Sequence, residues 1–327
     1  MQEYAHLLNS FSKHLLNYSA YLNSLSPKEL YQPGDYILSL GGKRVRPLLA
    51  LVACDLMNKK SEQALHAALA VELFHNFSLI HDDILDNAPK RRNKATVHKK
   101  WSTNIAILSG DILLVKAVQE LQKHSDKKNN QLITVFLKTA AEVCEGQQMD
   151  MNFETQKNVS VENYIHMISL KTAVLLGCSL QMGAIVAEAN QKTQQQLYEF
   201  GKHLGIAFQL MDDYLDVYAS KQQAFGKQIA GDIISNKKTF LLLKAFELAD
   251  KKTKIELSSA LKITSAPQEK IKKVKTMFNH LKVDELCLRE AEKHTQVALA
   301  CLNKIKADDD KKLQLKSFAL QLLSRKT

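Results

Sequence analysis

Residues that break helices are scarce in this chain, and their scarcity limits the possible fold more than any other feature. The 327 residues include only 5 prolines and 11 glycines, whereas Leu, Lys, Ala and Gln are abundant. Such a composition favours the α-helix, because a β-rich fold of this length would need more turn residues. We therefore predict an all-α protein, which is long enough to bury a sizeable core.

The apolar periodicity predicts one amphipathic helix after another. Pro27 ends the first, and Gly41-Gly42 interrupts the chain before a helix that has Pro47 in its first turn. A later break is expected near Pro267, with two closing helices after it. The first predicted helix covers residues 3–25. Further helices are predicted at 62–86, 102–124, 129–152, 161–188, 192–219 and 236–249.

Charge and cysteine content restrict the location and the partners. Lys and Arg number 45 against 34 Asp and Glu, a formal net charge of +11, so an anionic partner is expected. The five cysteines form no CxxC motif, which predicts reduced thiols in a cytoplasmic protein. No run of 18 apolar residues occurs, so we expect no membrane span and no export signal. Since no linker interrupts the chain, residues 1–327 are predicted to form a single domain.

Two stretches repeat the order Asp-Asp-X-Leu-Asp, each directly after an apolar run. Their aspartates are Asp82, Asp83 and Asp86 in the first motif, and Asp212, Asp213 and Asp216 in the second. Residues four apart share one face of a helix, so the outer aspartates of a motif can reach one point. Carboxylates without thiol ligands favour Mg²⁺ or Mn²⁺ held together with substrate phosphates. One such motif is commonly solvated surface, but two copies predict metal sites.

Basic motifs accompany the aspartates. In each, cations lie near a glycine or a helix start, where backbone N–H groups and long side chains can hold phosphate oxygens. These cations alternate with acidic motifs, and the chain has one Trp, so we expect anionic small molecules and no nucleic acid. The motifs are GGKRVRP at 41–47, RR at 91–92, KT at 171–172, FGK at 225–227 and NKKT at 236–239.

The order of these motifs resembles the trans-isoprenyl diphosphate synthase, or polyprenyl synthase, family. Between about residues 30 and 245 the chain presents GGKRVRP, HNFSLIHDDILDNAPKRR, CEGQQMDM, SLKTA, FQLMDDYLD and FGKQIAGDIISNKKTFL in the family's order. It departs from the family at Asn93 and Ala95, where RRGxPT is usual. Both lie in the loop after the arginines, so the departure concerns loop conformation rather than chemistry.

The resemblance implies an isoprenoid-synthase-type helical bundle around a deep central cavity, usually as a homodimer. The implied substrates are isopentenyl diphosphate and an allylic diphosphate, namely dimethylallyl, geranyl or farnesyl diphosphate. Three Mg²⁺ ions on the two aspartate motifs would bind the allylic diphosphate. The residues expected to complete that pocket are Arg91, Lys171, Lys227 and Lys237. Those expected to hold isopentenyl diphosphate are Lys43, Arg46, His75 and Arg92. Thr172 and Gln209 would lie near the allylic cation.

Three side chains before the first motif bear on product length. On a helix that ends in Asp82, Ser78 lies one turn below that aspartate and Phe74 one turn below Ser78, with Phe77 on the flank. A helical turn rises ~5 Å, comparable to one isoprene unit, so bulky residues here would stop chain growth. In the family, an aromatic residue at the position of Phe77 accompanies short products. Geranylgeranyl diphosphate is therefore predicted, with farnesyl diphosphate as the alternative; simple core packing of both phenylalanines is the competing interpretation.

Two other functions are compatible with parts of the pattern. A class I terpene cyclase shares the fold and DDxxD, but needs a different second metal motif and no second diphosphate pocket. The DDYLD and GGKRVRP stretches speak against it. A noncatalytic partner subunit could dispense with one aspartate motif, whereas this chain keeps both.

Overall fold

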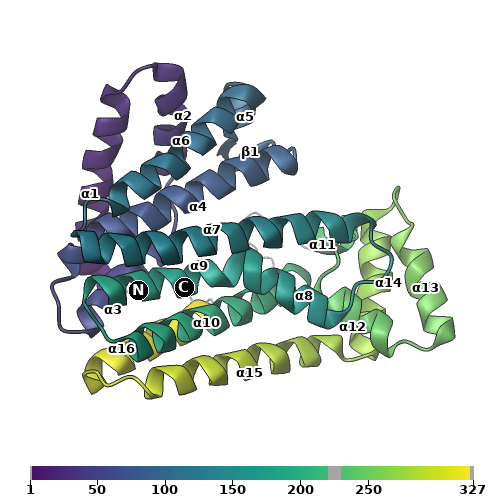
Figure 1. The fold of residues 1–327 in the computed structure, drawn as a ribbon. Helices are drawn as coiled ribbons and strands as arrows, with labels where there is room; N and C mark the ends of the chain where they lie inside the picture. The colour runs from purple at the N-terminus through teal and green to yellow at the C-terminus, as the bar shows by residue number, and fades with distance from the viewer. Residues whose placement is uncertain (1, 220–229, 325–327) are drawn as a thin grey trace. The chain divides into compact units, whose positions relative to one another are not determined.

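The fold is all-α, as predicted, in the computed structural model, which describes residues 2–219 and 230–324 (Figure 1). Within these residues, one short hairpin, β1 (Lys90–Arg91) with β2 (Lys94–Ala95), is the β-structure. The helices are α1 (Ala5–Ser24), α2 (Lys28–Ser39), α3 (Val45–Leu56), α4 (Leu65–Leu85), α5 (Val97–Lys100), α6 (Thr103–Leu121), α7 (Asp126–Thr155), α8 (Val161–Ile168), α9 (Val174–Val186), α10 (Gln191–Tyr218), α11 (Gly231–Ile234), α12 (Phe240–Leu248), α13 (Lys251–Leu261), α14 (Pro267–His280), α15 (Val283–Asn303) and α16 (Asp309–Ser324). Short 3₁₀ segments precede α1 and α4, at Gln2–Tyr4 and Ser61–Ala64.

The chain divides into two compact units. The first comprises Met1–Ala140, Leu175–Tyr198 and Asn303–Lys316, and the second comprises Ala141–Val174, Glu199–Leu302 and Ser317–Thr327. The first aspartate motif belongs to the first unit and the second motif to the second unit. The single domain over residues 1–327 stays a prediction.

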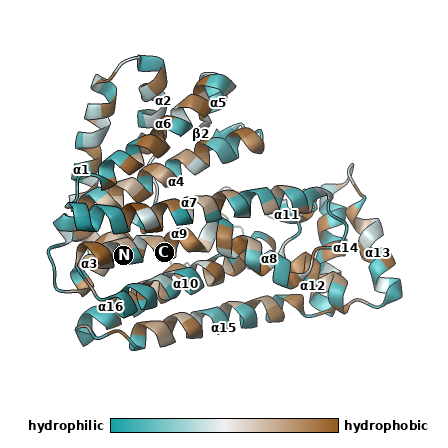
Figure 2. Ribbon diagram, in the orientation of Figure 1, coloured by the Kyte–Doolittle hydropathy of each residue, from teal (hydrophilic) through white to brown (hydrophobic). Residues whose placement is uncertain are grey.

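Helix α4 is the centre of the first unit. It packs mainly against α6 and α3, while α2 packs against α1 and α6. Every residue from Ala67 to Phe74 is buried, including Glu72, so this half of α4 is enclosed on all sides. Figure 2 shows α3 with mainly hydrophobic colouring. Helix α9 packs closely against α3 at Gly183. A Cβ on Gly183 would meet the carbonyl oxygen of Ala50 at 2.1 Å, so only glycine allows this approach.

The second unit has its own core around α8, α10, α12 and α14. Its largest buried side chains include Tyr164, Leu241 and Phe278. Helix α12 packs on α8 and α14, and α14 also contacts the short helix α11. This packing positions α11 and α12 within the unit that carries the second aspartate motif.

The ranges given for the predicted helices agree in position with the structure, but several local features were not foreseen, among them the short helices α5 and α11. The predicted helix 161–188 contains a π-helical turn at Ser169–Ala173, between α8 and α9. The hairpin β1–β2 lies in a segment without a predicted element. The prediction of two closing helices after Pro267 was wrong, because α14, α15 and α16 all follow it. Residues 304–308, between α15 and α16, contain neither Gly nor Pro that would have marked the break.

One segment, Val161–Val186, has the length and composition of a membrane-crossing helix. In the structure 78% of its apolar window is buried, as in the core helix of a folded protein. Its hydrophobicity is therefore explained by packing.

Candidate active site

The outer aspartates of the first motif lie on the last turn of α4. Asp86 caps the helix and its N–H donates to the carbonyl oxygen of Asp82 at 2.9 Å. Asp82 is partly exposed and Asp86 is exposed. The carboxyl end of a helix carries a partial negative charge, so carboxylates gathered there are destabilised unless a cation joins them. This placement suits the predicted metal ligands.

Asp83 has different surroundings from its two neighbours. Its side chain is 2% exposed and accepts two hydrogen bonds from Arg91, from Nε and Nη2, both at 2.9 Å. Arg91 is positioned by the hairpin, in which Arg91 pairs with Lys94. This ion pair holds both side chains in place. The predicted roles of Asp83 as a metal ligand and of Arg91 as a diphosphate ligand stay predictions.

The departure from the family at Asn93 is accommodated by the hairpin turn. Arg92 and Asn93 both have positive φ, at 52° and 63°. A two-residue hairpin of this type requires φ > 0 at both central positions, and Asn tolerates it better than other residues with a side chain. The turn directs Arg92 back to the carbonyl oxygen of Gly41, to which its Nη1 donates.

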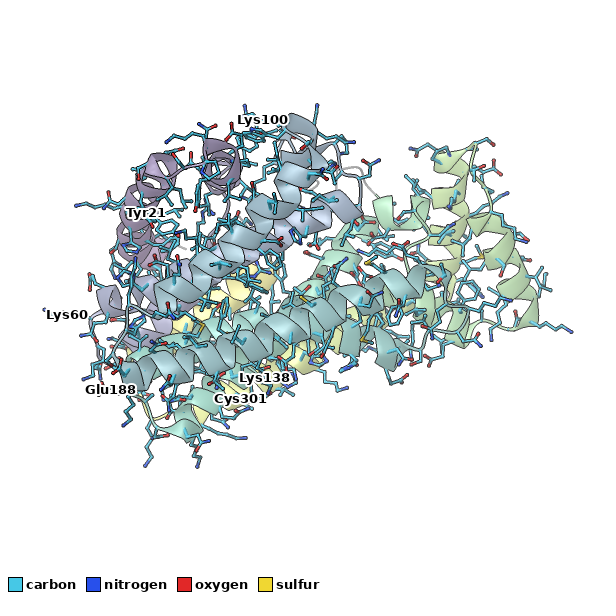
Figure 3. The ribbon with its side chains drawn as sticks, turned by 45° about the horizontal axis from the view of Figure 1, so that its top comes forward. Tyr21, Lys60, Lys100, Lys138, Glu188 and Cys301 are labelled. Carbon is cyan, nitrogen blue, oxygen red and sulfur yellow. The ribbon has the colours of Figure 1, made fainter. Side chains whose placement is uncertain are left out.

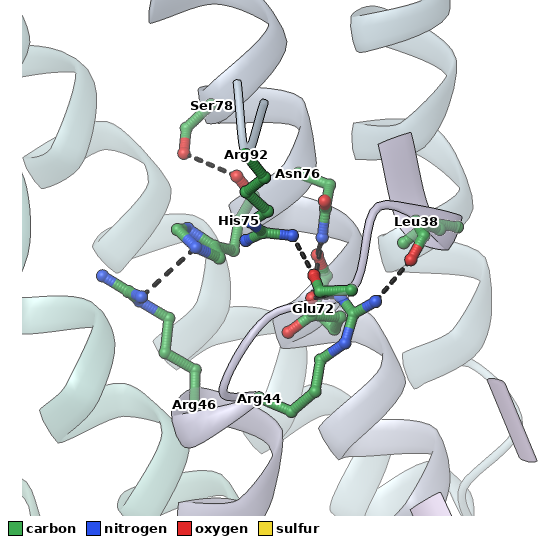
Figure 4. A network of polar contacts seen from close by, with 9 residues as sticks. Leu38, Arg44, Arg46, Glu72, His75, Asn76, Ser78 and Arg92 are labelled. Carbon is green, nitrogen blue, oxygen red and sulfur yellow. Dashed lines mark hydrogen bonds and ion pairs between the residues drawn. The ribbon is translucent and has the colours of Figure 1, made fainter. Parts of the chain in front are cut away.

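Side chains predicted to form the isopentenyl diphosphate pocket gather beside α4 and the Gly-Gly turn, in a network of polar contacts (Figure 4). Arg46 Nη1 lies 3.3 Å from His75 Nε2, and the Nε of Arg46 is buried without a hydrogen-bond partner among the described residues. Arg92 enters from the hairpin. Lys43 is exposed at the edge of the Gly-Gly turn. The structure thus brings together Arg46, His75 and Arg92, three of the four residues predicted for isopentenyl diphosphate.

Sequence reasoning missed the groups that hold this pocket. Arg44, in the left-handed conformation at φ 49°, pairs with the buried Glu72 and donates to the carbonyl oxygen of Leu38. Asn76 Nδ2 donates to Glu72 Oε1 at 2.8 Å. A glutamate within the apolar run ALAVELF was the available signal, because a buried charge requires a partner.

The charge balance of the pocket favours an anion. Glu72 is matched by Arg44, and Asp83 by Arg91, whereas no ion pair to a carboxylate is found for Arg46 or Arg92 in the described part of the chain. Burial lowers the pKa of Arg46 to about 10, so it stays charged at neutral pH. Burial, together with the nearby guanidinium groups, holds the pKa of His75 well below its usual range. A neutral His75 can accept a hydrogen bond from Arg46 and donate through its other nitrogen.

The second motif repeats the burial pattern of the first. Asp212 and Asp216 are partly exposed on the last turns of α10, whereas Asp213 is 3% exposed. Asp213 accepts from the hydroxyl of Tyr164, from Gln209 Nε2 at 3.3 Å and from the N–H of Phe240 at 3.4 Å. Burial raises the pKa of Asp213 to about 7, against the effect of these donors.

The start of the short helix α11 is hydrogen-bonded to the second motif. The Oδ2 atom of Asp216 accepts from the N–H of Asp232 at 3.1 Å, at the start of α11, and its carbonyl oxygen accepts from the N–H of Ala230 at 2.7 Å. The N–H of Lys237 donates to the carbonyl oxygen of Asp232 at 2.9 Å. Asp232 raises the pKa of Asp213, so its carboxylate adds negative charge near the motif. Asp232 was not predicted, because it stands alone in GDII without the spacing of the other aspartates.

The π-helical turn presents two of the predicted residues. Lys171 Nζ donates to Asp150 Oδ2 at 2.6 Å, and Thr172 Oγ1 donates to Gln209 Oε1 at 3.4 Å. A π-turn shifts the register of the side chains that follow, and such turns are frequent at functional sites. The structure brings Thr172 and Gln209 together, their place near the allylic cation stays a prediction, and Lys227 lies outside the described residues.

Phe74 and Phe77, which are predicted to limit product length, contact each other and two further aromatic rings. Phe74 is buried against Phe77, with ring centroids 5.5 Å apart, and against Phe136 of α7 at 5.4 Å. Phe77 in turn contacts the ring of His81 at 4.6 Å. Ser78 donates to the carbonyl oxygen of His75 at 2.9 Å. Phe136 was missed because it is 62 residues from Phe74 (136 − 74).

Comparison with known proteins decides the family. Residues 27–280 match the family model described as polyprenyl synthetase. The chain belongs to this family. The short chain isoprenyl diphosphate synthase of Methanocaldococcus jannaschii is 40% identical over 245 residues, covering 75% of this chain and 74% of the relative. The geranylgeranyl diphosphate synthase of Saccharolobus solfataricus is 36% identical over 282 residues, covering 85% and 84%.

A solved structure agrees with these relatives. The crystal structure of a geranylgeranyl pyrophosphate synthase matches with a TM-score of 0.91 and 44% identity, over 98% of this chain and 99% of that one. The isoprenoid-synthase fold is confirmed, and this polyprenyl synthetase is a prenyltransferase of isoprenoid biosynthesis. The family uses divalent metal ions. The roles of the individual residues and the central cavity stay predictions.

Proposed function

We propose that this enzyme lengthens allylic diphosphates with isopentenyl diphosphate and releases chiefly geranylgeranyl diphosphate. The observation that carries the proposal is the contrast between two groups of side chains, one of carboxylates and one of cations and an imidazole. The aspartate motifs can bind a diphosphate only through cations, whereas Arg46, Arg92 and His75 can bind one directly. Two diphosphates held in these two ways are the substrates of a condensation.

We propose that Asp82, Asp83, Asp86, Asp212 and Asp216 hold three Mg²⁺ ions, or Mn²⁺, for the allylic diphosphate. Their oxygen donors fit a hard cation, and the helix-end position of Asp82 and Asp86 fits a positive charge. When bound, the ions would stabilise the charge that develops on the departing diphosphate. Lys171, Lys237 and Lys227 would contact the same diphosphate, with Lys171 leaving Asp150 to do so.

The condensation breaks the allylic C–O bond, forms a C–C bond and transfers one proton from carbon to oxygen. The allylic C–O bond breaks with its electron pair going to the diphosphate, and the double bond of isopentenyl diphosphate attacks the allylic carbon. The proton lost from the new chain is accepted by the released diphosphate. In this proposal Thr172 and Gln209 direct their oxygen dipoles at the positive carbon, and exclusion of water protects it.

Product length is proposed to be set by Phe74 and Phe77. The support is their mutual contact and the relatives named geranylgeranyl diphosphate synthases. Farnesyl diphosphate is the alternative product. Products beyond 20 carbons are expected from Phe77→Ser and Phe74→Ala, measured by mass spectrometry of the dephosphorylated alcohols. Phe11→Ala, at another buried phenylalanine, is the control. An unchanged distribution in both variants would show that the limit lies elsewhere, and a native product beyond 25 carbons would contradict the short-chain assignment.

The activity is tested by diphosphate release from the full chain with an allylic diphosphate, isopentenyl diphosphate and Mg²⁺. We expect release to require all three components. Release without isopentenyl diphosphate, with a cyclic hydrocarbon as product, would identify a terpene cyclase instead. No release under any combination would indicate a noncatalytic partner subunit.

A homodimer in the cytoplasm is proposed for the assembly and location. Helix α6 exposes apolar side chains at Ile107, Leu108 and Val115, with Leu108 58% exposed. Such a stripe fits a surface that is covered by a second copy. Light scattering is expected to give about twice the chain mass of 36.9 kDa, and Leu108→Glu is expected to lower it. A monomeric native enzyme would overturn the proposal.

A further inference from the structure

Two histidines and a glutamate meet near the start of α4, within the first unit and apart from the candidate active site. They come from three helices: His14 from α1, His66 from α4 and Glu120 from α6. Their ligand atoms all lie within 4.8 Å of one another. Among the described residues, this is the group of His, Cys, Asp or Glu that comes close enough to bind a metal ion together.

Glu120 is the centre of the cluster. Its side chain is 3% exposed, and its Oε2 atom lies 2.7 Å from His66 Nδ1. The other oxygen, Oε1, accepts from Lys123 Nζ at 2.6 Å. The ring of His14 meets that of His66 edge to face, with centroids 5.2 Å apart. One carboxylate oxygen and two imidazoles therefore converge, while Lys123 holds the second oxygen.

A third histidine extends the cluster. His124 follows α6, and its ring centroid lies 6.1 Å from that of His66. The Nε2 atoms of His14 and His124 are both buried without a hydrogen-bond partner in the described part of the chain. A buried polar nitrogen without a partner is costly, and nitrogens of this kind are rare in folded proteins. Coordination of an ion is one way in which both atoms would be satisfied.

The cluster can be reached from solvent. The side chain of His66 is 35% exposed, which leaves a path from solvent.

We propose that His14, His66 and Glu120 bind one divalent transition-metal ion of the Zn²⁺ type, with His124 as the fourth ligand. Imidazole nitrogen with one carboxylate is a donor set for Zn²⁺, whereas Mg²⁺ prefers oxygen alone. Tetrahedral zinc with bonds of 2.0–2.1 Å needs ligand atoms about 3.3 Å apart. Side-chain movements of about 1 Å would reach that value, with the 2.7 Å contact between His66 and Glu120 widening and the longer spacings, up to 4.8 Å, narrowing.

The site is structural rather than catalytic. His66 precedes Asp82 by 16 residues (82 − 66) on the same helix, which is about 24 Å along the axis. An ion here would tie α1 and α6 to α4. The same two helices already touch, because Lys116 of α6 donates to Tyr21 Oη of α1 at 3.3 Å; Figure 3 labels Tyr21. Metal binding would therefore reinforce an existing contact between α1 and α6.

The test is a titration of the full chain with Co²⁺ and with Zn²⁺ in excess Mg²⁺, which occupies the oxygen sites of the aspartate motifs. We expect one equivalent of Co²⁺ to produce the intense visible absorption of a tetrahedral site, and Zn²⁺ to displace it. X-ray absorption on the Zn²⁺ form of the native protein is expected to show imidazole scattering. Six-coordinate oxygen ligation alone would overturn the proposal.

Variants sharpen the test in both directions. His14→Gln and Glu120→Gln are expected to weaken Zn²⁺ binding about 100-fold or more, whereas His280→Gln, at an exposed histidine on α14, leaves it unchanged. Lys123→Gln removes the competing cation from Glu120 and is expected to tighten binding several-fold. Equal affinities in His14→Gln and the native protein, or weaker binding in Lys123→Gln, would contradict the assignment.

Stability gives an independent readout. At a Zn²⁺ concentration 100 times its Kd, the melting temperature of the native enzyme is expected to rise by about 5 °C. Prenyltransferase activity with Mg²⁺ is expected to stay unchanged in His14→Gln. An identical rise in His14→Gln would place the ion elsewhere. Because the native protein is measured first, a variant that fails to fold does not decide the outcome.

Discussion

The two aspartate motifs have the same spacing but different environments. In both, the second aspartate is buried and the outer two face outward to some degree. Asp83 is anchored by the guanidinium of Arg91, a full positive charge delivered by a hairpin turn. Asp213 is anchored by neutral donors, namely Tyr164, Gln209 and a backbone N–H.

The difference shows that a shared motif does not specify a shared charge state. A carboxylate paired with arginine has its charge matched, and breaking the pair leaves a charge buried alone. A carboxylate among neutral donors is penalised by burial, which is why the pKa of Asp213 rises to about 7. The first motif should therefore depend on its ion pair, and the second on pH and on hydrogen bonds.

The largest effects are expected at the outer aspartates, where the two motifs should behave alike. Asp82→Ala and Asp212→Ala are each expected to lower kcat by about 10²–10⁴, because each removes a ligand of the ions that stabilise the leaving diphosphate. Circular dichroism is expected to show an intact fold. Asp310→Ala, at an exposed aspartate of α16, is the control. Near-normal turnover in either variant would remove the central assignment.

The inner aspartates should separate the two motifs by stability. Arg91→Ala leaves Asp83 buried without its partner and is expected to cost about 3–5 kcal/mol of unfolding free energy. Tyr164→Phe removes one neutral hydrogen bond and is expected to cost about 1–2 kcal/mol. Urea unfolding without Mg²⁺ measures both. If Tyr164→Phe proved the more costly change, the contrast between the motifs would be wrong.

A pH dependence of stability is expected from Asp213 in the second motif. Between the ordinary pKa of 3.8 and about 7, the folded protein holds the proton of Asp213 that the unfolded chain has lost. Its contribution to stability therefore falls as pH rises through this range. Asp213→Asn keeps an acceptor for Tyr164 without a charge, so it should stabilise the metal-free protein near pH 7 by on the order of 1–4 kcal/mol, and less near pH 4. A difference independent of pH would refute this account.

The smallest effect is expected outside both motifs. Lys43→Ala removes an exposed cation from the edge of the Arg46 pocket, so it should raise the KM for isopentenyl diphosphate about tenfold and that for the allylic substrate little. Steady-state kinetics with each substrate varied in turn measure both constants. Equal increases in both KM values would mean that Lys43 has been assigned to the wrong diphosphate pocket.

Local sequence was enough for most of the long helices, the aspartate spacing and the family, but not for the number of closing helices. Helix periodicity depends on residues three and four apart, and Gly and Pro act on the backbone where they stand, so these features can be read from short stretches. The hairpin and the π-turn were not predicted, because each is only one turn long. Each is stabilised by surrounding structure rather than by a repeated sequence pattern.

Only tertiary packing decided which aspartate of each motif is buried and which side chain forms its hydrogen bond or ion pair. Tyr164 is 49 residues from Asp213, and Arg44 is 28 residues from Glu72, so neither pairing has a local signal. The same holds for His14, His66 and Glu120, which come from three helices. A buried polar group requires a partner, but the chain positions that supply it are brought together by the fold, and spacing along the sequence does not specify them.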